Sequence, residues 1–180
     1  MRLVSVLGSS RCEADSFEYS MAERAGELLA RAGMGVITGG YGGVMEAALK
    51  GAAQCDGKCI GVTTAFYKNL EKNKFVQREV RTNSYNDYLM QIIDLSDAFI
   101  VLPGSVGTLF EFSAIWALMD VKAIKQKPAV CVGEQWKEIA QLMAFYSQEA
   151  QQSVGMFTFV ESPQEAVDAV ENFLKTPAVS

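Results

Sequence analysis

The segment "PGSVGTLFE", from Pro103 to Glu111, combines a glycine-rich turn with a carboxylate four residues beyond Gly107. It follows the apolar run "AFIVL", which is typical of a buried parallel strand. Such a turn lets backbone N–H groups converge, and the helix that starts there adds partial positive charge, so the segment predicts a phosphate cradle. Glu111 has two interpretations: a general acid or base, or a hydroxyl-binding group, that faces the ligand; or an acid that only interacts favourably with the helix dipole.

Two further loops have a similar composition, and each also follows an expected strand. A glycine in a single loop of this kind often serves packing alone. Three glycine-bearing loops at the same edge of one sheet indicate a nucleotide-like site, because ligands of open parallel sheets bind at the carboxyl ends of the strands. The loops supply these candidate phosphate-binding residues: Gly8, Ser9 and Ser10 of "GSSR"; Gly39, Gly40, Gly42 and Gly43 of "TGGYGG"; and Pro103, Gly104, Ser105, Gly107 and Thr108 of "PGSVGT".

The composition excludes several other chemistries. The chain has no histidine, which excludes Ser-His-Asp and Cys-His catalysis and histidine-ligated metals. No Gly-Lys-Ser/Thr follows a glycine loop, and "GGYGGV" does not keep the GxGxxG spacing, so neither a Walker A loop nor NAD binding is indicated. Cys55 and Cys59 lack a second ligand pair for zinc, and we expect reduced thiols. The sequence therefore predicts no metal and no resident cofactor, and no lysine stands in a recognisable pyridoxal phosphate setting.

The elements that must position these loops alternate along the whole chain. We expect strands at 3–7, 35–38, 59–64, 78–82, 98–102, 129–132 and 157–160. Between them, apolar residues recur at helical spacing, with Phe17, Met21, Ala25, Leu28 and Leu29 in the first helix and Phe112, Ile115, Trp116 and Met119 in the helix after the opening segment. This alternation predicts an α/β fold: a Rossmann-like open parallel sheet with helices on both faces, forming a single three-layer domain over residues 1–180.

Local signals mark where some helices begin and end. Asp15, with Glu18 three residues later, is the expected N-cap of the first helix, and Gly33 is placed to end it. Ser162, Pro163 and Glu165 predict the start of the last helix, which we expect to end near Leu174 and to leave residues 175–180 as a frayed tail.

Charge and hydropathy limit the partners. The net charge of −5 argues against a nucleic-acid binder, which needs a basic face. No apolar run approaches the roughly 20 residues that a membrane span needs, and the N-terminus lacks a signal-peptide pattern. We therefore expect a cytoplasmic protein with a small-molecule partner and neither nucleic acid nor membrane.

"PGSVGTLFE" resembles the PGGxGTxxE signature of the LONELY GUY (LOG) family, historically labelled lysine decarboxylase-like. "GGYGGVMEAALKGA" and the early "GSS" resemble that family's other glycine-rich contacts, and order and spacing agree over roughly residues 1 to 135. The resemblance implies a Rossmann-like fold, a homodimer, and hydrolysis of the N-glycosidic bond of nucleoside 5′-monophosphates such as AMP or cytokinin ribotides. It also implies that Glu111 is the catalytic glutamate. Relatives with the same loops bind nucleotides without known turnover or carry molybdenum cofactor.

Two positions depart from the family pattern. Ser105 replaces the second glycine of PGG, and Tyr88 stands where the family has a catalytic arginine. A tyrosine cannot supply the permanent charge with which an arginine orients a substrate and a carboxylate. Arg78 or Arg81 is a candidate substitute, and we include Arg81 and Tyr88 among the candidate binding residues. Two hypotheses follow: a LOG-like phosphoribohydrolase, or a non-catalytic nucleotide or molybdenum-cofactor-type carrier or sensor.

Overall fold

The computed structural model describes residues 1–175 and orders the elements as strand–helix units along the chain. The strands are β1 (Leu3–Leu7), β2 (Gly35–Thr38), β3 (Cys59–Thr64), β4 (Arg78–Thr82), β5 (Ala98–Val101), β6 (Ala129–Val132) and β7 (Phe157–Val160). The helices are α1 (Phe17–Arg31), α2 (Val44–Ala53), α3 (Tyr85–Leu95), α4 (Val106–Asp120), α5 (Glu134–Tyr146), α6 (Gln148–Ser153) and α7 (Pro163–Lys175), with a 3-10 turn at Val154–Met156.

The seven strands form one parallel sheet in the order β4-β3-β2-β1-β5-β6-β7. β1 lies at the centre, where Val4 pairs with Val36 of β2 on one side and with Ala98 of β5 on the other. The chain builds outward from β1 to β4 and then returns to the opposite side of β1 with β5. The predicted Rossmann-like α/β fold is confirmed, and its topological switch point lies between β1 and β5.

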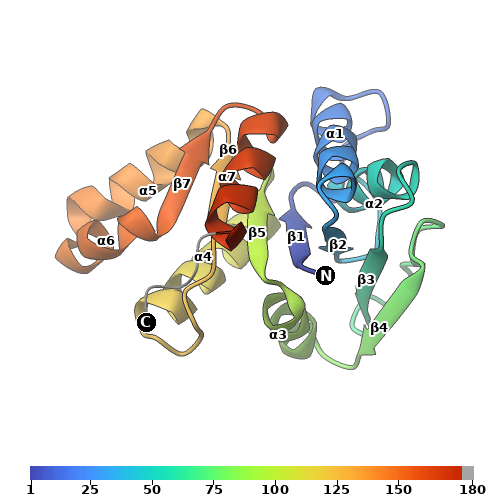
Figure 1. Ribbon diagram of the computed structural model, residues 1–180. Coiled ribbons are helices and arrows are strands. Elements are labelled where there is room, and N and C mark those ends of the chain that lie inside the picture. The colour runs from blue at the N-terminus through green and yellow to red at the C-terminus, as the bar shows by residue number, and fades with distance from the viewer. Residues whose placement is uncertain (176–180) are drawn as a thin grey trace.

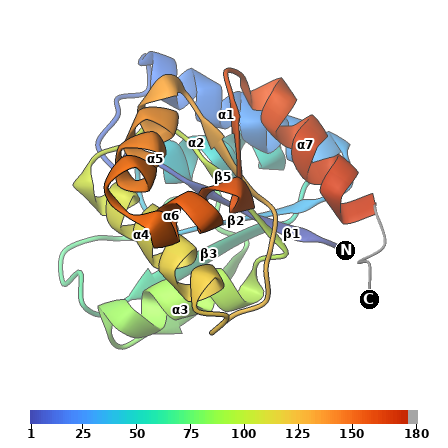
Figure 2. The same cartoon turned by 90° about the vertical axis from the view of Figure 1, so that its left-hand side faces the viewer.

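Helices cover both faces of the sheet (Figures 1 and 2). In Figure 1, α1, α2 and α7 lie above the strands and α3 and α4 lie below them. Alternate residues of β1 serve the two faces, since Val4 and Val6 pack in the core beneath α1, α2 and α7, whereas Leu7 packs in the core beneath α3, α4 and α5. Phe112, Ile115, Trp116 and Met119 of α4 are buried, as the helical spacing predicts.

Three local predictions need comment. The N-cap of α1 is Ser16 and not Asp15, because the Ser16 backbone is extended and its hydroxyl accepts the Tyr19 N–H at 3.2 Å. Phe17 is 74% exposed, since it stands at the first helical position, before the buried stripe begins. The capping box of α7 is confirmed, with the Glu165 N–H bonded to the Ser162 hydroxyl and the Glu165 carboxylate accepting the Ser162 N–H.

The segment between α5 and β7, for which no element was predicted, contains α6 and the 3-10 turn. α6 has only six residues, too few to produce a helical hydrophobic period. The expected tail begins at Lys175, the last residue of α7, and residues 176–180 lie outside the described residues.

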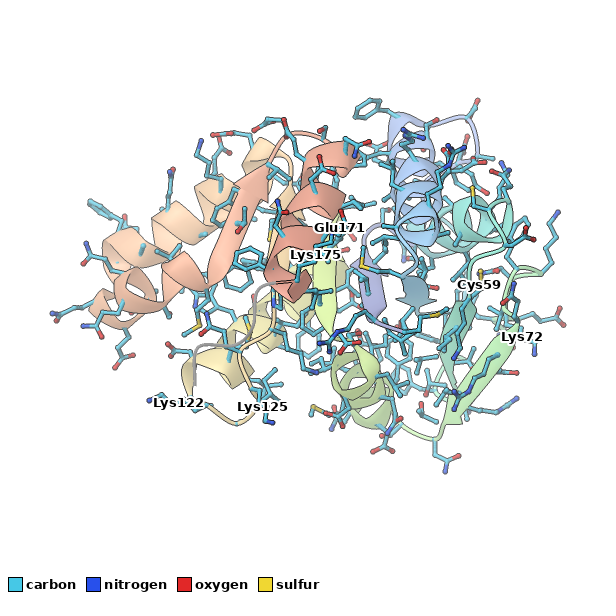
Figure 3. The ribbon with its side chains drawn as sticks, in the orientation of Figure 1. Cys59, Lys72, Lys122, Lys125, Glu171 and Lys175 are labelled. Carbon is cyan, nitrogen blue, oxygen red and sulfur yellow. The ribbon has the colours of Figure 1, made fainter. Side chains whose placement is uncertain are left out.

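All four cysteines are free thiols, and Cys59 and Cys131 are buried (Cys59 is labelled on β3 in Figure 3). Within residues 1–175, no cluster of three or more His, Cys, Asp or Glu side chains is placed to hold a metal ion. No helix in this range is long and apolar enough to cross a membrane.

Candidate functional site

The three predicted glycine loops meet at the switch point. The Ser9 N–H, after β1, donates to the Pro103 carbonyl after β5 at 3.3 Å. The Ser9 carbonyl in turn accepts the Val44 N–H, at the start of α2, at 2.8 Å. The loop after β1 therefore holds the two other glycine loops together at the carboxyl edge of the sheet.

A cavity of about 470 Å³ opens at this edge, between the loops and α3. Nine of the predicted site residues line it: Gly8, Ser10, Gly39, Gly42, Tyr88, Ser105, Gly107, Thr108 and Glu111. A second cavity of about 330 Å³ adjoins the first, with Ser105 and Arg11 in both walls, and Ser9, Pro103 and Gly104 line it. Gly40 and Gly43 are absent from the walls of both cavities.

The glycines of the loops divide into two groups. A Cβ on Gly43 would overlap the Ser9 carbonyl oxygen, so Gly43 lets two backbone segments approach closely. A Cβ on Gly104 would overlap the Thr108 hydroxyl, so Gly104 makes room for that side chain. A Cβ on Gly107 would meet no other residue within 4 Å, although Gly107 lines the cavity. Its lack of a side chain leaves the backbone open to a ligand, which is the functional interpretation of a glycine-rich turn.

Helices α2 and α4, which follow the second and third glycine loops, lack side-chain N-caps. Gly43 caps α2 and Ser105 caps α4, and neither makes a side-chain bond to the first turn. Ser16 and Ser84, by contrast, cap α1 and α3 with their hydroxyl oxygens. The first-turn N–H groups of α4, beside Gly107, are therefore available to an anion.

Glu111 lies one turn further along α4 and faces the same cavity. Its carboxylate has no hydrogen bond or ion pair with any other residue in the described chain. Burial raises the pKa of Glu111 from an ordinary 4.5 to about 7, and no nearby cation opposes the rise. The Glu111 charge also contributes to raising the pKa values of Tyr67, Tyr85 and Tyr88, after burial, which places these rings around it.

These rings belong to an aromatic cluster on one wall of the cavity. The centroids of Tyr85 and Tyr88 are 5.5 Å apart, and those of Tyr67 and Tyr85 are 6.1 Å apart. Tyr41 packs edge-on against Tyr67 at 5.5 Å and bonds through its hydroxyl to the Thr64 backbone N–H at 2.9 Å. We call Tyr41, Tyr67, Tyr85 and Tyr88 the tyrosine wall.

A loop without periodic pattern, residues 65–77, carries Tyr67 to this wall. Asn73 fastens the loop to the second glycine turn, since its backbone N–H donates to the Gly40 carbonyl at 2.8 Å and its side chain to the Tyr41 carbonyl at 2.7 Å. The second glycine turn thus helps to position an aromatic side chain of the cavity.

Neither candidate substitute for the family arginine, Arg78 or Arg81, lines the cavity that holds Glu111. Arg81 lines a different cavity, of about 710 Å³, beside Lys72 and Glu79, which form an ion pair at 2.8 Å. Figure 3 shows Lys72 beside β4, at the edge of the molecule remote from α5 and α6. Tyr88 itself is buried, and its hydroxyl lies over the backbone of Gly39. Tyr88 therefore stands beside Glu111, and no arginine within residues 1–175 forms an ion pair with its carboxylate.

The set of predicted site residues missed several that line the main cavity: Arg11, Tyr41, Met45, Tyr67, Leu70 and Tyr85. Arg11 directly follows "GSS", so its position in a candidate binding loop could have indicated that it lines the site. Tyr67 and Leu70 had no such signal, because they belong to the aperiodic loop 65–77.

Comparisons with known proteins agree with this architecture. A molybdenum cofactor binding protein from Rippkaea orientalis superimposes with a TM-score of 0.77 at 21% identity, covering 97% of this chain and 98% of that one. The molybdenum cofactor carrier protein of Chlamydomonas reinhardtii gives a TM-score of 0.72 at 23% identity, covering 98% and 100%. At these identities the likeness shows the fold.

Sequence comparison gives the family. An uncharacterized protein of Archaeoglobus fulgidus is 33% identical over 130 residues, which cover 72% of this chain and 82% of that protein. The model of the SLOG cluster4 family matches residues 1–167. The narrower LOG assignment stays a prediction. The extent of the family match shows that the chain belongs to the SLOG cluster4 family.

Proposed function

We propose that this protein binds a phosphate-bearing heterocyclic small molecule in the main cavity and holds it without turnover, as a carrier or sensor. The cargo is of the molybdenum-cofactor type or a nucleoside monophosphate. The observation that carries the proposal is the unpaired carboxylate of Glu111 beside Tyr88, in a cavity that also has an open helix N-terminus.

The cavity has the two kinds of surface that such a ligand needs. The open N-terminus of α4 at Gly107 suits a phosphate, and the tyrosine wall suits a planar ring. Its volume of about 470 Å³ falls within the usual range for small-molecule sites, roughly 300–1,000 Å³.

The lack of a cation beside Glu111 favours binding over hydrolysis. Glycosidic cleavage separates charge between the ribose and the departing base, and an arginine would orient and stabilise it. Loss of one such electrostatic group typically lowers the rate about 10²- to 10³-fold. The solved structures named above are of molybdenum cofactor binding and carrier proteins, which supports a carrier role. A cargo whose organic part already chelates its metal needs no cluster of metal-ligating side chains, and residues 1–175 offer none.

A pair of glycine variants tests the proposed site. Gly107→Ala adds a methyl group at the open cradle, and Gly155→Ala adds one in the 3-10 turn, where it also meets nothing within 4 Å. We expect mass spectrometry to find a phosphate-bearing ligand retained by the wild type and by Gly155→Ala, with less retained by Gly107→Ala. In calorimetry with nucleoside monophosphates and a pterin monophosphate, the wild type and Gly155→Ala should likewise bind more tightly than Gly107→Ala. Failure of every phosphate-bearing ligand to bind the wild type would refute the proposal.

A second candidate is the LOG-like phosphoribohydrolase. Its support is the pKa of Glu111, about 7, which suits a general acid or base near neutral pH. The protein is incubated with AMP, and free adenine is measured against Glu111→Ala. Release that depends on Glu111 would favour the enzyme, and equal background from both proteins would favour the carrier.

We also propose a homodimer formed through α4. Exposed apolar side chains lie along this helix, with Val106 79% and Phe110 49% exposed, and Val121, directly after its last residue, is 71% exposed. Light scattering should find a dimer that Val121→Asp dissociates and that Phe17→Asp, on the exposed start of α1, leaves intact. Dissociation by both variants or by neither would contradict this interface.

A further inference from the structure

The main cavity holds two charged side chains among its lining residues, Arg11 and Glu111. Arg11 and Ser105 also line the second cavity, so they mark one end of the main cavity. Tyr41, Tyr67 and Leu70 also line the cavity beside β4, so they mark the other end. The cavity therefore runs from a cationic end, near the loop after β1, to an aromatic end.

Glu111 belongs with the aromatic end. Its charge acts on Tyr67, Tyr85 and Tyr88, and it has no ion-pair partner in residues 1–175. It follows Gly107 by four residues on α4, so the two share a helix face about 6 Å apart along the axis. A ligand whose phosphate sits at the first turn of α4 can then extend its ring past Glu111.

A carboxylate in this position selects among rings by hydrogen-bond pattern. An ionised carboxylate only accepts, and its two oxygens match two adjacent N–H donors. Guanine and 2-amino-4-oxopterin rings present such a donor–donor edge, whereas adenine presents a donor beside an acceptor. Hypoxanthine keeps a single ring N–H on this edge.

We infer that Glu111 pairs with the donor–donor edge of a 2-amino-4-oxopyrimidine-type ring that packs on the tyrosine wall, and so sets the specificity of the site. The inference rests on the proposed function and names the ligand class within it. Pairing would also give the half-buried carboxylate the partners that it lacks in the free protein. An acid that served only the helix dipole would need neither the cavity nor the surrounding tyrosines.

Calorimetry at pH 8 with GMP, IMP and AMP tests the inference on the whole protein. We expect GMP to bind about 10- to 100-fold more tightly than AMP, the effect of two charge-assisted hydrogen bonds, with IMP between them. Glu111→Gln replaces one acceptor by a donor, which matches adenine, so this variant should lose the GMP preference and bind AMP at least as well as GMP. Glu138→Gln, on the exposed face of α5, is the matched control and should keep the wild-type order.

The outcomes separate the inference from the proposed function. Equal affinity of the wild type for the three monophosphates would overturn the inference and leave phosphate binding standing. An equal loss for all three in Glu111→Gln would also overturn it, because it would indicate a general structural effect. Gly107→Ala should weaken all three by the same factor, since it alters only the phosphate end. Binding of none of them, nor of a pterin monophosphate, would refute the proposed function itself.

If Glu111→Gln fails to fold, the wild-type ranking still decides the matter. Glu111→Asp provides a second variant, which keeps the negative charge but, because its side chain is one methylene shorter, holds the carboxylate further from the ring. It should narrow the GMP preference without reversing it, and reversal would contradict the bidentate pairing.

Discussion

Replacement of Glu111 by glutamine should stabilise the free protein in a pH-dependent way. Burial raises the pKa of Glu111 to about 7 in the folded chain, against 4.5 for an ordinary glutamate. Each pH unit of difference corresponds to about 1.4 kcal/mol, so the ionised carboxylate destabilises the fold by about 3 kcal/mol.

The direction of this pH dependence follows from the raised pKa of Glu111. Below pH 4.5 Glu111 is neutral in both the folded and the unfolded chain, and it contributes no penalty. As the pH rises towards 7, the unfolded chain ionises first, so the wild type loses stability over this window and the loss is complete above about pH 7. Glu111→Gln stays neutral throughout, and its advantage should grow from near zero at pH 4 to about 3 kcal/mol at pH 8.

Urea denaturation at pH 4, 6 and 8 measures this advantage. Glu138→Gln, on the exposed face of α5, controls for the general effect of removing one negative charge and should show little dependence on pH. An advantage of Glu111→Gln that is the same at pH 4 and pH 8 would refute the claim that the carboxylate is desolvated and unpaired.

Three further substitutions test the packing around the site and the fold. Gly104→Ala places a Cβ on the Thr108 hydroxyl, so we expect a loss of about 1–3 kcal/mol in urea denaturation together with weakened ligand binding; unchanged stability would contradict the packing role. Ser153→Ala removes the acceptor of the buried Trp116 indole N–H, bonded at 2.7 Å, and should cost about 1–3 kcal/mol and alter the tryptophan fluorescence, whereas a neutral change would mean that the N–H finds another partner. Glu165→Ala breaks the capping box of α7 and should lower the thermal midpoint through a loss of about 1 kcal/mol, with Glu138→Ala as the surface control.

The strands and most helices could be read from the chain because their signals are local. The apolar run of β5 and the helical spacing of Phe112, Ile115, Trp116 and Met119 predicted both their type and their burial. Where an element had no periodic signal, as in the six residues of α6, no element was predicted. The N-cap of α1 lies one residue after the predicted one. Asp15 and Ser16 are both polar residues suited to an N-cap, and the extended backbone conformation of Ser16 decides which of them caps the helix.

The candidate site could be predicted in part. The glycine loops were found because composition and position after a strand are visible in the sequence, and the fold then brought them to one edge at the switch point. Their individual roles could not be found in this way, since Gly104 and Gly107 look alike in sequence. One is closed off by Thr108, and the other is open to the cavity.

The sequence by itself determined the order of the elements, the parallel α/β architecture and the positions of the glycine-rich loops, because hydrophobic period and turn chemistry act over a few residues. Tertiary structure alone decided what surrounds Glu111. Tyr67 reaches it from the aperiodic loop that Asn73 ties to a glycine turn, and Tyr85 and Tyr88 reach it from α3, while Arg81 faces another cavity. Such contacts between distant residues depend on how loops fold over the sheet edge, and no local pattern in the chain encodes them.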